Sequence, residues 1–135
     1  MPLLSITRLR VRSIRFMPKF FWYAMKSYKQ AQKADGNLAA KTFKDKGLVF
    51  WTCSIWEDEL YMLNYMKNGI HKKAMPYLQQ WCNEARTGHM MVPGNEFPSP
   101  AEMAKMLLKF GRSSKVMHPN ENHLQQIFPE PVFKI

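Results

Sequence analysis

Hydrophobic and polar residues alternate along two stretches of the chain in the way that predicts β-strands. In residues 3–13, every second position from residue 8 is basic and the positions between are mostly apolar. Residues 49–56 are dense in aromatic and apolar residues and contain no Gly or Pro, as a buried strand requires. Trp51 and Trp56 fall on opposite faces of this second strand, so neither face is expected to contact bulk water.

Two shorter stretches predict the remaining strands of a sheet. Residues 37–43 are joined to residues 49–56 by a polar connection that ends in Gly47, which is the usual signal of a hairpin. Residues 86–92 are the candidate fourth strand. Together these patterns predict four strands, of which the second and third pair as a hairpin.

Apolar residues recur at helical spacing in three regions. Residues 16–33 predict a first helix with lysines outside its apolar stripe; the stripe comprises Met17, Phe21, Ala24 and Tyr28, widened by Phe20 and Met25. A basic, aromatic helix can lie on a membrane surface, but a core stripe is the favoured interpretation. Residues 57–85 predict a helical region in two pieces, since Gly69 breaks the pattern and Pro76 does not fit deep inside a helix. Residues 99–110 begin with a capping box and end before Gly111.

The order β-α-β-β-α-β is that of a ferredoxin-like α+β fold. Its two helices cover only one face of the sheet, and a second copy is the simplest cover for the other. The sequence therefore predicts a dimeric α/β barrel. At 135 residues the chain is expected to form a single domain, with a core at residues 1–92 and a C-terminal helix and packed tail at residues 93–135.

Composition adds a strongly basic surface to this picture. The net charge is +10, from 20 basic and 10 acidic residues, so anionic ligands or surfaces are candidate partners. The chain carries none of the nucleic-acid-binding motifs, and nucleic acid is not an expected partner. No apolar run is long enough for a transmembrane segment. Cys53 and Cys82 lie inside apolar patterns, which favours reduced thiols in a cytoplasmic protein.

His71 is the candidate for catalysis, because it starts the second helical piece, where a pocket between helix and sheet would open. A neutral imidazole there could act as a general base or ligate heme iron; the alternative is that it packs at a helix end. Trp51, Trp56, Tyr65 and Trp81 could line a cavity for a flat apolar ligand, or be ordinary core. No metal site is predicted, because no metal-ligand spacing is present.

A second candidate site would bind an anionic group. Arg8 and Arg10 share one face of the first strand, and Arg112 and Lys115 follow the last helix. If the tail folds back over the sheet, these side chains could converge on a carboxylate or phosphate. Alternatively, Arg112 and Lys115 only match the partial negative charge of the helix end.

Four stretches carry a resemblance to a known family: TRLRVRS, FWTCSIWEDE, GIHKKAMPYLQQWCNEA and GRSSKVMHP. They resemble an uncharacterised bacterial family of the dimeric α/β-barrel superfamily, which includes antibiotic-biosynthesis monooxygenases, heme-degrading monooxygenases and spheroidene monooxygenase-like proteins. The resemblance implies a monooxygenase-like oxidoreductase that binds a small apolar or aromatic ligand, with heme as a candidate cofactor.

The resemblance departs from the heme-degrading members at one position. Their ligand histidine lies about one turn beyond His71, where this chain has Met75. Heme degradation is therefore not implied, and binding of heme through His71 is left open. The alternative function is that of a non-enzymatic binding or interaction protein that uses its basic surface.

We expect the protein to be a homodimer, because strand 49–56 carries large aromatic residues on both faces and one subunit's two helices cover only one of them. Light scattering at micromolar concentration should give twice the mass of the chain. The mass of a single chain would contradict this prediction.

Overall fold

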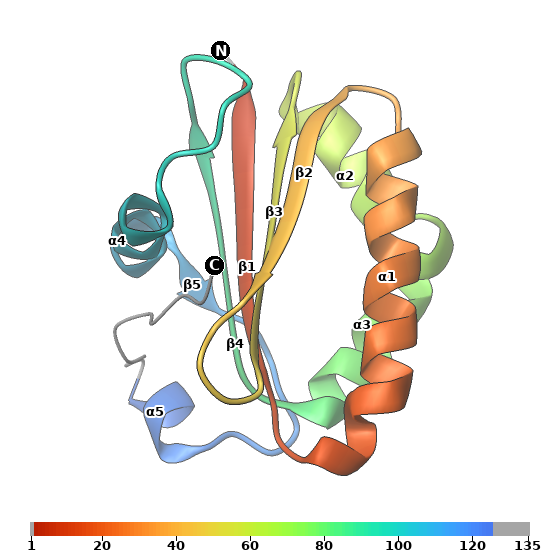
Figure 1. Cartoon of the computed structure of the whole chain (residues 1–135), viewed down its shortest axis with the longest axis vertical. Coiled ribbons are helices and arrows are strands. Elements are labelled where there is room, and N and C mark those ends of the chain that lie inside the picture. The colour runs from red at the N-terminus through yellow and green to blue at the C-terminus, as the bar shows by residue number, and fades with distance from the viewer. Residues whose placement is uncertain (1, 126–135) are drawn as a thin grey trace.

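A five-stranded antiparallel sheet forms the centre of the computed structural model, which describes residues 2–125 (Figure 1). The strands are β1 (Leu3–Val11), β2 (Asn37–Lys44), β3 (Val49–Trp56), β4 (Cys82–Met91) and β5 (Arg112–Ser113), in the spatial order β2-β3-β1-β4-β5. The helices are η1 (Ile14–Phe16), α1 (Met17–Lys33), α2 (Glu59–Met66), α3 (Gly69–Trp81), α4 (Pro100–Phe110) and α5 (Glu121–Leu124). The predicted ferredoxin-like α+β fold is confirmed. The predicted packing of residues 126–135 lies outside the described residues.

The boundary between α3 and β4 differs from the prediction. The strand begins at Cys82 rather than at residue 86, and α3 ends at Trp81. Cys82 is fully buried and pairs with Val11 of β1 beyond an irregularity in the register. The sequence pattern missed this segment because its apolar residues also fit the helical stripe that precedes it.

The break between α2 and α3 lies at residues 67–68, and Pro76 is inside α3 without ending it. Gly69 begins α3 with a φ of +60°, a conformation that glycine adopts readily. Proline has no N–H, so the carbonyl oxygen of Lys72, four residues earlier, loses its usual amide partner. Both Lys72 and Pro76 are exposed. Water can therefore bond this oxygen, which lowers the cost of the proline.

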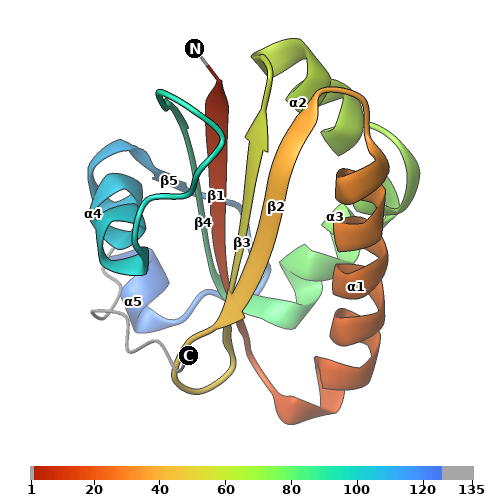
Figure 2. The same cartoon turned by 45° about the horizontal axis from the view of Figure 1, so that its top comes forward.

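The two faces of the sheet are covered by different parts of the same chain (Figures 1 and 2). Helices α1, α2 and α3 lie on one side, and α4 lies on the other. On the α4 side, Trp51, Cys53 and Ile55 of β3 pack with Met103 and Leu107 of α4 in one buried cluster. Trp51 is fully buried within the single chain. The reason given for a dimer, an uncovered face at Trp51, is therefore wrong, and the dimer itself stays a prediction.

Arg86 of β4 holds the C-terminal end of α4 against the sheet. Its Nε donates to the carbonyl of Leu107 at 3.1 Å, and its Nη2 donates to those of Leu108 at 3.2 Å and Gly111 at 2.9 Å. The last carbonyls of a helix lack partners within the helix and carry partial negative charge. Arg112 and Lys115 are the cations that the sequence suggests for this role; the cation that bonds these carbonyls is Arg86, which reaches them from the neighbouring strand.

Trp56→Ala should lower the free energy of unfolding by about 3–5 kcal/mol, because Trp56 is fully buried against Leu3, Met62 and Tyr65. Urea denaturation would measure the change. Trp22→Ala is the matched control: Trp22 is 51% exposed, and its removal should cost about 0.5 kcal/mol or less. Equal effects of the two substitutions would contradict the placement of Trp56.

Candidate functional site

The helix-facing side of the sheet is apolar at both ends and polar in the middle. Near one end, Leu3 and Trp56 join the cluster under α2, and near the other end Val11 joins the cluster under α1 and α3. Between these clusters, Thr7 of β1 is paired with Thr52 of β3 and with Thr87 of β4. A core face would be expected to carry apolar residues at these central positions, so the polar middle marks this region as a candidate site.

The polar middle forms two rows across the strands. The first, which we call the threonine row, comprises Thr42, Thr52, Thr7, Thr87 and Arg112, each paired with the next across the sheet. The second comprises Ser54, Ser5 and His89 on β3, β1 and β4. Thr52 is exposed although β3 is paired on both sides. The helical layer therefore leaves Thr52, in the middle of this face, open to solvent.

His89 is the titratable group of this polar region. Its Nε2 is buried and has no hydrogen-bond partner among the described residues. Burial lowers the pKa of His89, the positive charge of Arg112 lowers it further, and Glu59 raises it. The ring is therefore neutral at pH 7, and such a ring can offer an unprotonated nitrogen to a ligand.

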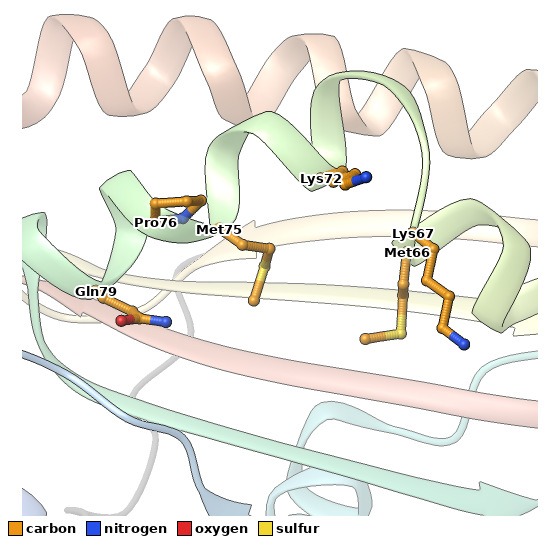
Figure 3. Close-up of a pocket in the computed structure, with 6 residues that line it drawn as sticks. All are labelled: Met66, Lys67, Lys72, Met75, Pro76 and Gln79. Atoms are coloured by element: carbon orange, nitrogen blue, oxygen red, sulfur yellow. The ribbon is translucent and has the colours of Figure 1, made fainter.

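A groove of about 590 Å³ lies along the α2–α3 segment. It is lined by Met66, Lys67, Lys72, Met75, Pro76 and Gln79. Figure 3 shows the side chains of Met66, Met75 and Gln79 pointing away from α1. All six residues that line the groove belong to the α2–α3 segment. Its apolar residues can contact an apolar ligand, and its two lysines favour an anionic group.

His71 lies elsewhere, between α1, α2 and α3. Its Nδ1 is 3.2 Å from the carbonyl oxygen of Met66, and its ring packs on Tyr65 with centroids 4.8 Å apart. Its backbone N–H donates to Oε1 of Gln30 at 3.0 Å. Burial lowers the pKa of His71, and the contact with Met66 partly opposes this. His71 does not line the groove, so these contacts match the packing alternative more closely than the catalytic one.

The four aromatic residues predicted to line one cavity are divided among three places. Trp56 and Tyr65 are together, with ring centroids 5.2 Å apart. Trp51 is on the opposite face of the sheet, stacked on Phe43 at 6.0 Å. Trp81 lies in the cluster under α1 and α3. A single cavity lined by all four is therefore wrong, since alternation along β3 sends Trp51 and Trp56 to opposite faces.

The four basic residues predicted to share an anion are also divided. Arg8 is buried, and its Nη1 is 3.2 Å from Oε1 of Glu84; Nε of Arg10 is 3.5 Å from Oε2 of the same side chain. Asn120 Nδ2 donates to that Oε2 at 2.9 Å. Arg112 belongs to the threonine row, on the other face. The carboxylate at Arg8 and Arg10 is thus the protein's own Glu84, and the proposed convergence with Arg112 is wrong.

Sequence reasoning missed His89, the threonine row and Glu84. The four threonines could not be linked, because each is on a different strand and only the register aligns them. A weaker signal was present: Thr7 and Thr52 interrupt strands that are otherwise rich in apolar residues. Glu84 was overlooked because its segment was assigned to a helix.

These contacts decide whether heme, the candidate cofactor, fits beside His71. A heme ligated by His71 would have to enter the packed cluster of Trp56, Met62 and Tyr65, so these residues do not fit heme at that position. Within residues 2–125 there is no group of His, Cys, Asp and Glu that could hold a metal ion.

Cys53 and Cys82 are free and buried, as predicted. Burial raises the pKa of both thiols to about 12, which makes them poor nucleophiles at neutral pH.

None of the helices within residues 2–125 is long and apolar enough to span a membrane. No protein-family model matches the chain, and no curated protein is similar to it in sequence.

Several solved structures are similar in fold. Rv0793 from Mycobacterium tuberculosis superposes with a TM-score of 0.63 at 7% identity, over 70% of this chain and 97% of that protein. An antibiotic biosynthesis monooxygenase gives 0.61 at 12% identity, over 68% and 99%. SnoaB from Streptomyces nogalater, a cofactor-independent oxygenase, gives 0.59 at 10% identity, over 73% and 98%. Identities this low show the fold alone, and the chain therefore has the ferredoxin-like fold of the antibiotic biosynthesis monooxygenase-like proteins.

Proposed function

We propose that the protein binds a small, largely apolar or aromatic molecule between the sheet and the α2–α3 segment, and acts on it as a monooxygenase-like oxidoreductase. The observation that carries the proposal is the buried Nε2 of His89, on a ring whose pKa is lowered by burial, beside rows of hydroxyl groups that solvent reaches. A nitrogen without a partner among residues 2–125 is costly unless a ligand or water bonds it.

Different residues around the site would contact the apolar and the polar parts of the bound molecule. The apolar groups of Met66, Met75 and Pro76 would contact the body of the molecule. The hydroxyls of Ser5 and Thr7, on the central strand, would bond its polar groups. This combination of apolar wall and a few polar groups suits a flat aromatic molecule that carries a hydroxyl or carbonyl.

His89 would serve as the general base. A neutral imidazole can accept a proton from an acidic hydroxyl or an activated C–H group. The positive charge of Arg112, which acts on His89, would stabilise the anion that remains. An electron-rich anion of this kind is a reactant for dioxygen, the co-substrate of a monooxygenase-like reaction. The fold similarity to a protein described as a cofactor-independent oxygenase agrees with this assignment.

His71 is the alternative base that the sequence suggested. Its ring is also neutral at pH 7, since its pKa is lowered by burial. However, its ring is packed on Tyr65, and His71 does not line the groove. We therefore assign proton transfer to His89 and keep His71 as the matched comparison.

Bound 4-nitrophenol, a flat aromatic with an acidic hydroxyl, should ionise about one pH unit lower than free 4-nitrophenol, because an adjacent cation and a proton acceptor favour the phenolate. Absorbance of the phenolate as a function of pH measures this shift. His89→Gln should abolish most of it, and His71→Gln should leave it unchanged. The reverse result would return the role of base to His71.

A blocking variant tests the location independently. Thr52→Trp should weaken binding of 4-nitrophenol about tenfold or more, because it fills the open middle of the face. Leu108→Trp, at a residue that is 57% exposed on α4, is the control and should bind normally. Unchanged binding by Thr52→Trp would place the molecule outside this site.

The pH dependence of stability should report both histidines. Their pKa values in the folded protein lie below the ordinary 6.5, so below pH 6.5 the unfolded chain binds more protons than the folded one. This contribution to stability is fully present above pH 6.5 and is lost as the pH falls toward the folded pKa values. Urea denaturation between pH 7.5 and about pH 5 measures the loss. The free energy of unfolding should fall less in the His71→Gln/His89→Gln double variant than in the unaltered protein. An identical loss in both proteins would contradict neutral, buried histidines.

A further inference from the structure

Helix α1 presents apolar residues on two faces, of which only one is buried. Phe20 and Ala31 are buried on the face toward the sheet. On the opposite face, Phe21 is 58% exposed, Trp22 51% and Met25 38%. The prediction that Phe21 and Met25 pack in the core is therefore wrong, because α1 is rotated so that Phe20 and Ala31 meet the sheet instead.

The segment that carries these exposed residues is basic and contains no acid. Residues 14–33 include five basic residues and no Asp or Glu. All five are exposed: Arg15, Lys19, Lys26, Lys29 and Lys33. Lys26 lies with its Nζ 5.8 Å from the centre of the Trp22 ring. We call Phe21, Trp22, Met25 and the four lysines of α1 the outer face of α1; Ile14 and Arg15 of η1, which directly precedes the helix, are exposed as well.

The aromatic surface continues from α1 onto α3. Trp22 contacts Tyr23 edge to face with centroids 4.9 Å apart, and Tyr23 lies 5.4 Å from Tyr77 of α3. Tyr77 is 45% exposed and is stacked on Trp81. These contacts anchor the exposed rings to the core, so the outer face is a fixed feature of the fold rather than a single mobile side chain.

We propose that the outer face of α1 binds the surface of an anionic lipid bilayer. Exposed Trp and Phe side chains on a helix insert at the boundary between headgroups and acyl chains, and neighbouring lysines attract anionic headgroups. Exposed aromatic side chains and lysines are both present on α1, a single helix of 17 residues. Figures 1 and 2 show α1 beside the α2–α3 segment, on the side of the sheet away from α4.

A second copy of the chain is the other occupant to consider for this surface. Two outer faces brought together would oppose four lysines with four more, and no acid in residues 14–33 would compensate them. Charge complementarity therefore favours an anionic bilayer over self-association. The groove and His89 are not part of this surface, and the proposal holds whether or not the protein is an oxidoreductase.

Sedimentation with vesicles tests the proposal. The full chain should bind vesicles made of equal parts phosphatidylglycerol and phosphatidylcholine, and should bind pure phosphatidylcholine weakly. Added salt should weaken the binding. Two double variants, Phe21→Ser/Trp22→Ser and Lys19→Glu/Lys26→Glu, test the two parts of the surface. Each should reduce the affinity for the anionic vesicles by about tenfold or more. All four positions are exposed, and circular dichroism verifies that each variant is folded.

A matched control is available on α4, on the other side of the sheet. Leu108 and Phe110 are 57% and 58% exposed, and Lys105 and Lys109 are exposed beside them. Leu108→Ser/Phe110→Ser and Lys105→Glu/Lys109→Glu should bind vesicles like the unaltered protein. Equal loss in the α4 variants would overturn the proposal, as would failure of the unaltered protein to bind anionic vesicles. A dimer that Phe21→Ser/Trp22→Ser dissociates, without vesicle binding, would assign the face to self-association instead.

Discussion

The need to bury both faces of β3 within one chain governs this structure. Trp51, Cys53 and Ile55 project to one side of the strand and Trp56 to the other, and all four are buried. Helices α1 to α3 cover only the Trp56 side, so the chain supplies α4 for the opposite side. The hydrogen bonds from Arg86 to the carbonyls at the end of α4 hold this cover in place. Burial of a single large aromatic residue contributes a few kcal/mol, which is a large share of a typical domain's stability.

The polar middle of the helix-facing side is the exception to this burial. Hydroxyl groups sealed under helices without partners would each cost about 1–3 kcal/mol. The structure avoids this cost in two ways: Thr87 donates to the carbonyl of Ile6 at 3.2 Å, and Thr52 remains exposed. An opening between two packed clusters follows, and His89 lies in its second polar row. The candidate site thus arises where the core is least complete, which is also where a ligand can replace solvent.

The positive charge of the chain is distributed unequally between interior and surface. Arg8 is buried, and Glu84 compensates it through a contact of 3.2 Å; Arg10 and Asn120 bond the same carboxylate. A buried charge without its partner would be strongly destabilising, so the role of Glu84 is to stabilise the fold. The basic residues of α1 have no acid within residues 14–33. Their charge is therefore available to an external anionic surface, and the exposed aromatic residues beside them make a bilayer the better match.

The sequence by itself determined the order of the four long strands and of the helices packed on them, and with it the fold; the short elements β5 and α5 were not predicted. Alternation at β1 and β3, the hairpin after Phe43 and the capping box of α4 are local patterns, and local sterics and hydrogen bonding enforce them. The burial of Trp56 also followed, because it ends a dense apolar strand. Tertiary structure decided which residues meet: strand register aligned the four threonines, the rotation of α1 exposed Phe21 and Met25, and packing placed Glu84 beside Arg8. Such contacts join residues far apart in the chain, and their geometry depends on the whole fold rather than on any local pattern.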